Sequence, residues 1–166
     1  MNIRQISIGF AVFLGLLFWG FNPIVLKISA AVLVGTAGRL ALKNVPWLEF
    51  VTVLTVYTGS SLGGLAGAYV GFFCIILSDI AWYDFSNTLW NAPTFAAIGA
   101  LSGVIHLEFV VLVGLMTLLY NIIVNTIVML AYGASPFASI IWTALHIFVN
   151  VTVAGYLEPR LIAFWA

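Results

Sequence analysis

Residues 59–80 read GSSLGGLAGAYVGFFCIILSDI, and this stretch decides the fold. Glycine recurs at every fourth position of it: Gly59, Gly63, Gly67 and Gly71. In a helix of about 3.6 residues per turn, this spacing keeps the glycines close to one face, where a second helix can approach closely. The apolar run then closes on one carboxylate, Asp79, which at bilayer depth costs about 2.5 kcal/mol or more without a partner, cavity or ligand. The stretch predicts a membrane helix that carries either a packing seam with Asp79 at the interface or a polar site.

The composition of the whole chain places it in a membrane. Of its 166 residues, 64% are hydrophobic and 6% are charged, and the mean hydropathy is +1.21. A water-soluble domain of this composition would expose too much apolar surface. The apolar runs are continuous and separated by short breaks, which indicates membrane-spanning helices. We therefore expect an all-α, multi-pass helical bundle in the cell membrane, with residues 1–166 forming a single transmembrane domain.

The charge and ligand inventory argues against several function classes. The formal net charge is zero and no basic cluster occurs, so we expect no nucleic-acid partner. Two histidines, one cysteine and scattered carboxylates give no three-ligand spacing, so we expect no metal site and no cofactor. Residues 63–67 lack the Lys-Ser/Thr of a phosphate loop, so the chain itself should not hydrolyse ATP. We expect a non-enzymatic protein surrounded by membrane lipid.

Seven apolar stretches can be drawn along the chain: 4–21, 24–42, 47–60, 62–82, 93–106, 108–132 and 137–163. The third and the fifth fall short of the ~20 residues that cross the hydrocarbon core. One helix over residues 93–132 would reach about 60 Å, too long for one span, so we divide it near residues 106–108. The sequence thus predicts six to seven transmembrane helices, with 4–21 as the possible extra one.

Two late stretches each carry a pair of polar residues one turn apart. Asn121 and Asn125 lie on one face of the sixth stretch, and His146 and Asn150 lie on one face of the seventh. Amides and imidazole both donate and accept hydrogen bonds, which suits a neutral or zwitterionic small molecule. The same pairs could instead hydrogen-bond to each other between helices, at about 0.5–1.5 kcal/mol each. The pattern leaves both interpretations open.

The connection over residues 82–91 mixes aromatic and polar side chains, as small-molecule pockets do. It supplies Asp84, Asn87 and Trp90 as candidate ligand contacts, although its tryptophans would also suit an interface anchor. Arg39, at the end of the second stretch, could neutralise a substrate carboxylate, Asp79 or Asp84. As a helix-end residue that reaches the membrane surface it would need no ligand.

Stripes of small residues predict further helix contacts. Ser7, Ala11 and Gly15 form one stripe, and Ala31 and Gly35 form a shorter one. Such stripes dock helices, either within the chain or on a separate subunit, and spacing alone does not decide between these.

Together these features resemble the substrate-binding S components of energy-coupling factor (ECF) transporters, small six-helix membrane proteins that capture vitamins and related micronutrients. The resemblance covers residues 24–164. It rests on these segments: Gly38-Arg39-Leu40 with Val45-Pro46, Val51-Thr52 and Gly59, then Gly63 to Asp79, residues 97–103, residues 119–125 and residues 146–150. The stretch 4–21 is extra to the six-helix core, and residues 84–91 replace a glycine- and tryptophan-rich loop common in the family.

The resemblance implies a ligand pocket near the outer membrane face and helix faces that dock on a transmembrane coupling subunit driven by two ATPase subunits. The implied substrate-binding residues are Arg39, Asp79, Asp84, Asn87, Trp90, Asn121, Asn125, His146 and Asn150. The implied docking residues are Ser7, Ala11, Gly15, Ala31, Gly35, Gly63, Gly67 and Gly71. A vitamin-like ligand would be occluded under the connection between Trp82 and Trp90 and released when a partner reorients the bundle.

Two other classes compete with this interpretation. A rhomboid-type intramembrane protease would pair Ser102 with His146, but Ala100 stands where its motif requires glycine two residues before the serine. A non-catalytic structural subunit, similar to the cell-shape membrane proteins, would satisfy Asp79, Asn121 and His146 inside the bundle. The transporter hypothesis instead predicts a cavity into which at least three of the polar candidates point.

Overall fold

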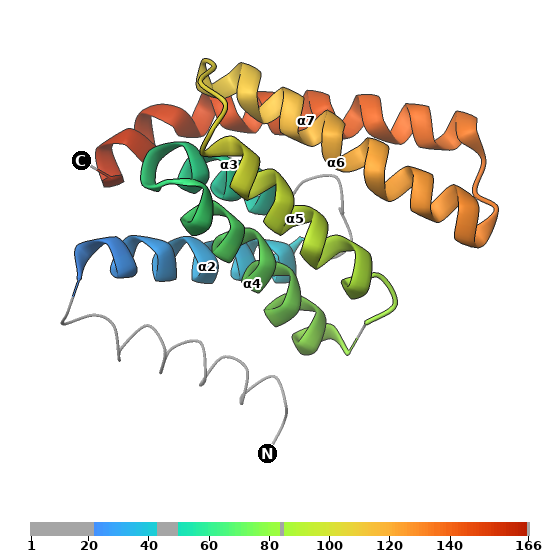
Figure 1. The fold of residues 1–166 in the computed structure, drawn as a ribbon, viewed down its shortest axis with the longest axis horizontal. Helices are drawn as coiled ribbons and strands as arrows, with labels where there is room; N and C mark the ends of the chain where they lie inside the picture. Colours follow the sequence, from blue (N-terminus) through green and yellow to red (C-terminus); the bar gives the residue numbers. More distant parts are fainter. Residues whose placement is uncertain (1–21, 43–49, 84, 166) are drawn as a thin grey trace.

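The described part of this computed structural model comprises residues 22–42, 50–83 and 85–165, and it forms six α-helices (Figure 1). With the labels of Figure 1 they are α2 (Pro23–Ala41), α3 (Phe50–Leu62), α4 (Gly64–Trp82), α5 (Thr88–Ser102), α6 (Phe109–Tyr132) and α7 (Pro136–Trp165). The expected all-α class is confirmed for these residues. The predicted stretch 4–21, with Ser7, Ala11 and Gly15, lies outside them, as does Asp84.

Four of these helices, α2, α4, α6 and α7, are long and apolar enough to cross a membrane. The remaining two have 13 and 15 residues, about 20 Å, which is shorter than a hydrocarbon core. By length and composition the chain is therefore a multi-pass membrane protein, with four candidate spans in the residues that the structure describes. This supports the membrane prediction without reaching the expected six to seven spans.

Helix α5 corrects one predicted boundary, because it begins at Thr88 and not near residue 93. The carbonyl oxygen of Asn87 accepts from the backbone N–H groups of Trp90 (3.1 Å) and Asn91 (2.9 Å), so the first turn closes well before the proline. Pro93 is carried inside the helix on its exposed side. The connection expected over residues 82–91 is consequently reduced to 83–87.

Helix α3 lies at the centre of the structure. Every residue from Val51 to Gly59 is buried, and the helix contacts α2, α4, α5, α6 and α7. A single residue, Gly63, joins it to α4 with φ +98°, a left-handed conformation that side chains rarely adopt. Gly63 therefore makes the corner between the two helices, and its role is conformational.

The other glycines of the opening stretch pack against helices of the same chain. A β-carbon added to Gly67 would lie 2.6 Å from Gly59 Cα and 2.7 Å from Gly99 O. One added to Gly71 would lie 2.6 Å from Phe95 O. Backbones of α3, α4 and α5 thus meet directly, which confirms a packing seam. Gly67 and Gly71, expected to dock a partner, are occupied by this chain's own helices.

The shorter stripe on α2 is also used internally. Ala31 and Gly35 are buried against α4, where a β-carbon on Gly35 would lie 2.6 Å from the Cys74 sulfur. The Cys74 thiol lies 3.5 Å from the carbonyl oxygen of Val32, so this lone cysteine is part of the packing. Helices α2 to α5 form one body, which we call the glycine-packed body.

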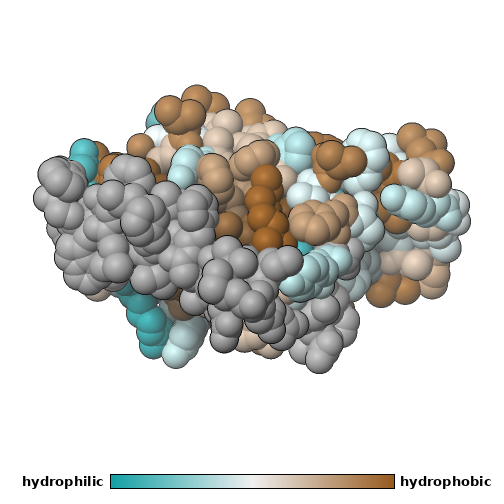
Figure 2. All heavy atoms as spheres, turned by 90° about the horizontal axis from the view of Figure 1, so that it is seen from below, coloured by the Kyte–Doolittle hydropathy of each residue, from teal (hydrophilic) through white to brown (hydrophobic). Residues whose placement is uncertain are grey.

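Helices α6 and α7 form a long antiparallel hairpin that extends from the glycine-packed body at the right of Figure 1. In the most apolar 18-residue segment of α7, 17% is buried inside the structure, whereas 56% of the corresponding segment of α4 is buried. The exposed side chains of the hairpin are largely apolar, including Ile122, Leu130, Ile140 and Phe148. Figure 2 shows hydrophobic side chains, in brown, among paler and hydrophilic ones on another face of the molecule. Such a surface suits lipid or another apolar partner.

Candidate functional site

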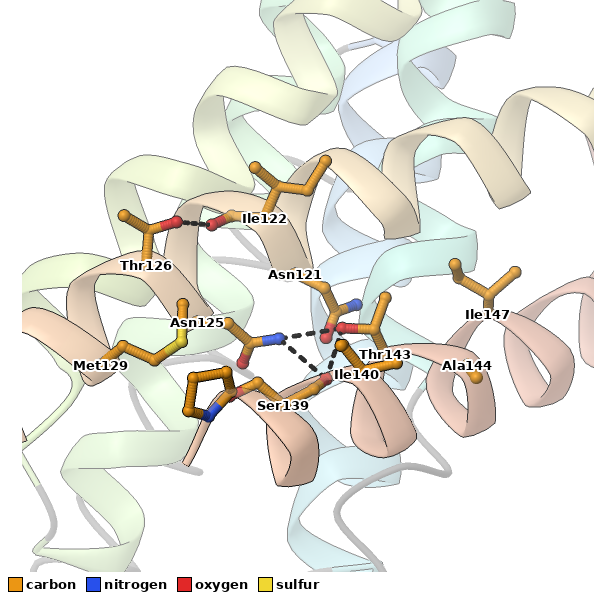
Figure 3. Close-up of a pocket in the computed structure, with 11 residues that line it drawn as sticks. Asn121, Ile122, Asn125, Thr126, Met129, Ser139, Ile140, Thr143, Ala144 and Ile147 are labelled. Carbon is orange, nitrogen blue, oxygen red and sulfur yellow. Dashed lines mark hydrogen bonds between the residues drawn. The ribbon is translucent and has the colours of Figure 1, made fainter. Parts of the chain in front are cut away.

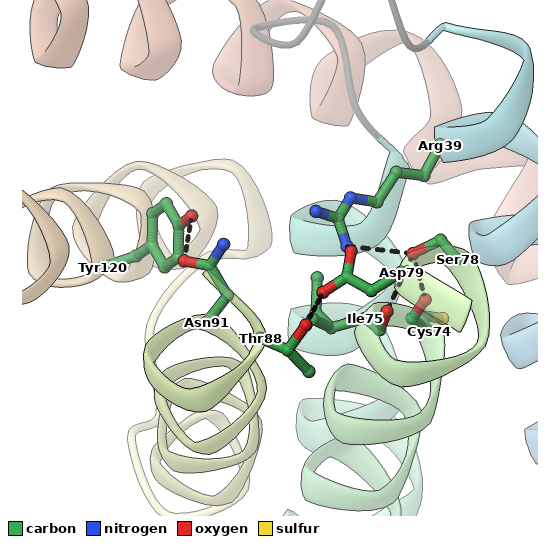
Figure 4. Close-up of polar contacts among 8 residues, drawn as sticks. All are labelled: Arg39, Cys74, Ile75, Ser78, Asp79, Thr88, Asn91 and Tyr120. Carbon is green, nitrogen blue, oxygen red and sulfur yellow. Dashed lines mark hydrogen bonds and ion pairs between the residues drawn. The ribbon is translucent and has the colours of Figure 1, made fainter. Parts of the chain in front are cut away.

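A buried ion pair closes one end of the glycine-packed body (Figure 4). Arg39 Nη1 lies 2.9 Å from Asp79 Oδ1, and the two side chains are 15% and 4% exposed. The same nitrogen donates to Ser78 Oγ at 2.9 Å, and the guanidinium lies over the Trp82 ring at 5.1 Å from its centroid. In this low-dielectric setting each charge is stabilised chiefly by the other.

The second carboxylate oxygen of Asp79 is also used. Thr88, the first residue of α5, donates its hydroxyl to Asp79 Oδ2 at 2.6 Å. Ser78 in turn donates to the carbonyl oxygens of Cys74 (2.6 Å) and Ile75 (3.0 Å). The cluster therefore ties α2, α4 and α5 together, and Asp79 has a partner on each oxygen.

A further set of polar contacts runs from α5 across α6 to α7. Asn91 lies one turn after Thr88 and accepts a hydrogen bond from the Tyr120 hydroxyl at 3.1 Å (Figure 4). The Tyr120 ring packs edge-on to His146, with centroids 5.8 Å apart. The two sets of polar contacts share α5 and together involve five helices. Thr88, Asn91 and Tyr120 were not among the predicted site residues, because an isolated polar residue in a helix gives no signal of its neighbours.

Polar side chains also face each other along the α6–α7 interface. Asn121 Nδ2 lies 3.0 Å from His146 Nδ1 and donates to the Thr117 carbonyl oxygen at 2.7 Å. One turn toward the hairpin end, Asn125 Nδ2 donates to Thr143 Oγ1 at 2.9 Å. The interhelical interpretation therefore holds for Asn121 and His146, which meet across the interface, whereas Asn125 bonds Thr143 and not a member of the other predicted pair.

The register of these contacts places Asn150 opposite Thr117, one turn beyond the contact between Asn121 and His146. Asn150 and Thr117 are both 0% exposed. Thr117 donates its hydroxyl to the carbonyl oxygen of Val113 at 2.7 Å. Neither Nδ2 nor Oδ1 of Asn150 has a hydrogen-bond partner among the residues that the structure describes. A buried amide of this kind is costly, so this is the least satisfied polar position of the interface.

The hairpin end holds a groove of about 530 Å³ between α6 and α7 (Figure 3). It is lined by Asn121, Ile122, Asn125, Thr126, Met129, Pro136, Ser139, Ile140, Thr143, Ala144 and Ile147. In Figure 3 the Asn125 side chain projects between the two helices, with its amide nitrogen on Thr143 and Ser139. Ser139 and Thr143 were not predicted, because sequence spacing does not give the register between two helices.

The predicted candidates are thus distributed over four places. Asn121 and Asn125 line the groove, His146 and Asn150 lie deeper in the α6–α7 interface, and Arg39 pairs with Asp79. Asn87 precedes α5 and is exposed, and Trp90 lies on α5 with 39% exposure. The groove therefore receives two of the candidates, where the transporter hypothesis expected at least three.

Neither the serine-protease pair that competes with the transporter hypothesis nor a metal-ligand cluster is assembled in the described ranges. Ser102 donates its hydroxyl to the Ile98 carbonyl oxygen at 2.7 Å, and it forms no hydrogen bond with His146. Within residues 22–42, 50–83 and 85–165, no three histidine, cysteine or acidic side chains gather as metal ligands would.

Comparisons with known proteins add no identity to this geometry: no family model, no curated protein and no solved structure matches the chain.

Proposed function

We propose that this chain is a membrane-embedded binding subunit that captures a vitamin-sized molecule for uptake, as the S components of ECF transporters do. The groove between α6 and α7 carries the proposal, because it contains Asn121 and Asn125, two residues that the sequence singles out. Its volume of about 530 Å³ falls in the range of small-molecule sites, roughly 300–1,000 Å³. Apolar side chains with a few amides and hydroxyls are the usual lining of such sites.

Energy for uptake would come from other subunits. The chain carries no phosphate-loop sequence, so the proposal assigns ATP hydrolysis to two ATPase subunits and their transmembrane coupling subunit. Because Ala31, Gly35, Gly67 and Gly71 are used inside the chain, the docking stripe that remains from the sequence is Ser7, Ala11 and Gly15. That stripe lies outside the described residues.

A structural, non-catalytic membrane subunit is the second candidate. It is favoured by the closure of Arg39 on Asp79 and by the contact of Asn121 with His146, since both satisfy polar groups inside the bundle. The groove would then be a lipid-filled surface depression.

Native mass spectrometry of the gently extracted protein separates these candidates. We expect a co-purifying species of vitamin size in the wild type and its loss in Asn121→Ala/Asn125→Ala. Thr152→Ala is the matched control, because its hydroxyl donates to the Phe148 carbonyl oxygen on the exposed side of α7, away from the groove. Absence of a bound species from all three proteins would favour the structural subunit, and its retention in the double variant would show that the groove between α6 and α7 is not the binding site.

A further inference from the structure

We propose that the α6–α7 groove selects an uncharged, amphipathic molecule that donates an O–H or N–H hydrogen bond to Oδ1 of Asn125 and enters from the bilayer. This names the substrate class of the proposed site and rests on the proposed function. Three features of the groove carry it: the absence of charge, the direction of its hydrogen bonds and its position on the hairpin.

The groove offers no counter-ion to a charged ligand. None of its eleven lining residues is acidic or basic. The buried charges of the glycine-packed body, Arg39 and Asp79, neutralise each other and come from α2 and α4, which contribute no residue to the groove. Moving an ion from water into such a site would cost several kcal/mol, and no opposite charge in the groove would offset this cost. A neutral ligand avoids this cost.

The side-chain donors of the groove are already committed within the chain. They donate as follows: Asn121 to Thr117 O, Asn125 to Thr143 Oγ1, Thr126 to Ile122 O, Ser139 to Ser135 O and Thr143 to Ser139 O. Oδ1 of Asn125 receives no hydrogen bond from any residue in the described part of the chain. The groove therefore presents acceptors and lacks free donors, and a ligand that donates fits it better than one that only accepts.

The position of the groove points to access from the lipid. Its rim includes Ile122 and Ile140, which are 54% and 67% exposed, and both lie on helices long enough to span a membrane. Pro136 and Met129 place it near the hairpin turn at residues 133–135, and so toward one end of the two spans. A molecule with an apolar body and one polar group favours this depth of a bilayer.

Photolabelling in lipid nanodiscs tests the proposal with three probes that share one diazirine-bearing C12 chain: the primary alcohol, its methyl ether and the carboxylate. We expect the alcohol to label peptides of residues 121–147 about fivefold more than the ether, the selectivity of one hydrogen bond. The carboxylate should label them least. Asn125→Leu should make alcohol and ether equal, whereas Thr152→Ala should keep the wild-type ratio.

The wild-type probe series is decisive even where Asn125→Leu does not fold. Equal labelling by alcohol and ether would overturn the donor assignment, and strongest labelling by the carboxylate would overturn the neutral class. If the probes fail in either way while native mass spectrometry still finds a species lost in Asn121→Ala/Asn125→Ala, the binding function stands and this substrate class is wrong.

Discussion

The helices of the glycine-packed body and those of the α6–α7 hairpin associate through different kinds of contact. In the body, backbones of α3, α4 and α5 touch at Gly59, Gly67 and Gly99, and the ion pair of Arg39 with Asp79 is closed at one end. In the hairpin, side-chain amides and hydroxyls join two helices that otherwise remain widely exposed. Contact between backbones leaves no room for a ligand, whereas contact through side chains leaves a groove.

This contrast locates the two roles of the molecule. Without a hydrophobic drive between helices in lipid, close backbone approach supplies the packing energy of the body. Polar groups in the hairpin contribute less, about 0.6 kcal/mol each in membrane proteins, so their arrangement is freer to serve binding. We therefore expect stability to depend on the body and ligand selection to depend on the hairpin.

The largest expected effect is at Gly99. A β-carbon there would collide with the backbone of Gly67 and Ala68, which no flexible side chain can relieve. Gly99→Val should therefore leave no folded, monodisperse protein in size-exclusion chromatography after mild extraction. Gly155→Ala is the control, because nothing lies within 4 Å of that position, and it should raise stability by up to about 1 kcal/mol. A folded Gly99→Val protein would show that α4 and α5 do not pack through their backbones.

Breaking the ion pair should be the next largest change. Asp79→Ala leaves Arg39, 15% exposed, without its carboxylate, and should lower the free energy of unfolding by about 3 kcal/mol in a detergent denaturation series. Arg39→Met/Asp79→Leu removes both charges and should recover most of that loss, since apolar replacement of a buried pair is often neutral. Equal instability of the single and double variants would argue that the pair is required for more than charge compensation.

A smaller change of opposite sign is expected at Asn150. Asn150→Leu removes a buried amide that has no hydrogen-bond partner in the described residues and should raise the unfolding free energy by about 1 kcal/mol. Asn121→Leu, which removes a partnered amide one turn along the interface, should lower it by a similar or smaller amount. Thermal unfolding of the wild type, Asn150→Leu and Asn121→Leu in one detergent measures both changes in stability. Destabilisation by Asn150→Leu would indicate that this amide is satisfied in the membrane.

Much of the fold follows from the sequence because hydrophobic runs and glycine spacing report local structure. The ends of α4, α6 and α7 lie within about two residues of the ends of the predicted apolar stretches, which is the usual uncertainty of a helix boundary. The predicted start of α5 is wrong because proline marks a helix boundary in the sequence, whereas the carbonyl oxygen of Asn87 closes the first turn before Pro93.

The site was predictable only in part, since it depends on how helices are set against each other. Asn121 and Asn125 carry a visible signal, two amides at one-turn spacing in an apolar run. Thr143 and Ser139 carry none, because they become part of the groove only through the register between α6 and α7. Arg39 and Asp79 are an intermediate case, because the sequence offers their pairing as one alternative to a ligand contact and only the structure places the two side chains together.

The glycine contact between α4 and α5 also has a genetic signature. Every missense change of a glycine codon adds at least one carbon, and at Gly67 and Gly99 that carbon meets main-chain atoms of the neighbouring helix. In a saturation library selected for membrane expression, these two codons should tolerate only synonymous changes, while Gly155 should accept many residues. The tolerance profile alone would then trace the line along which the two helices touch.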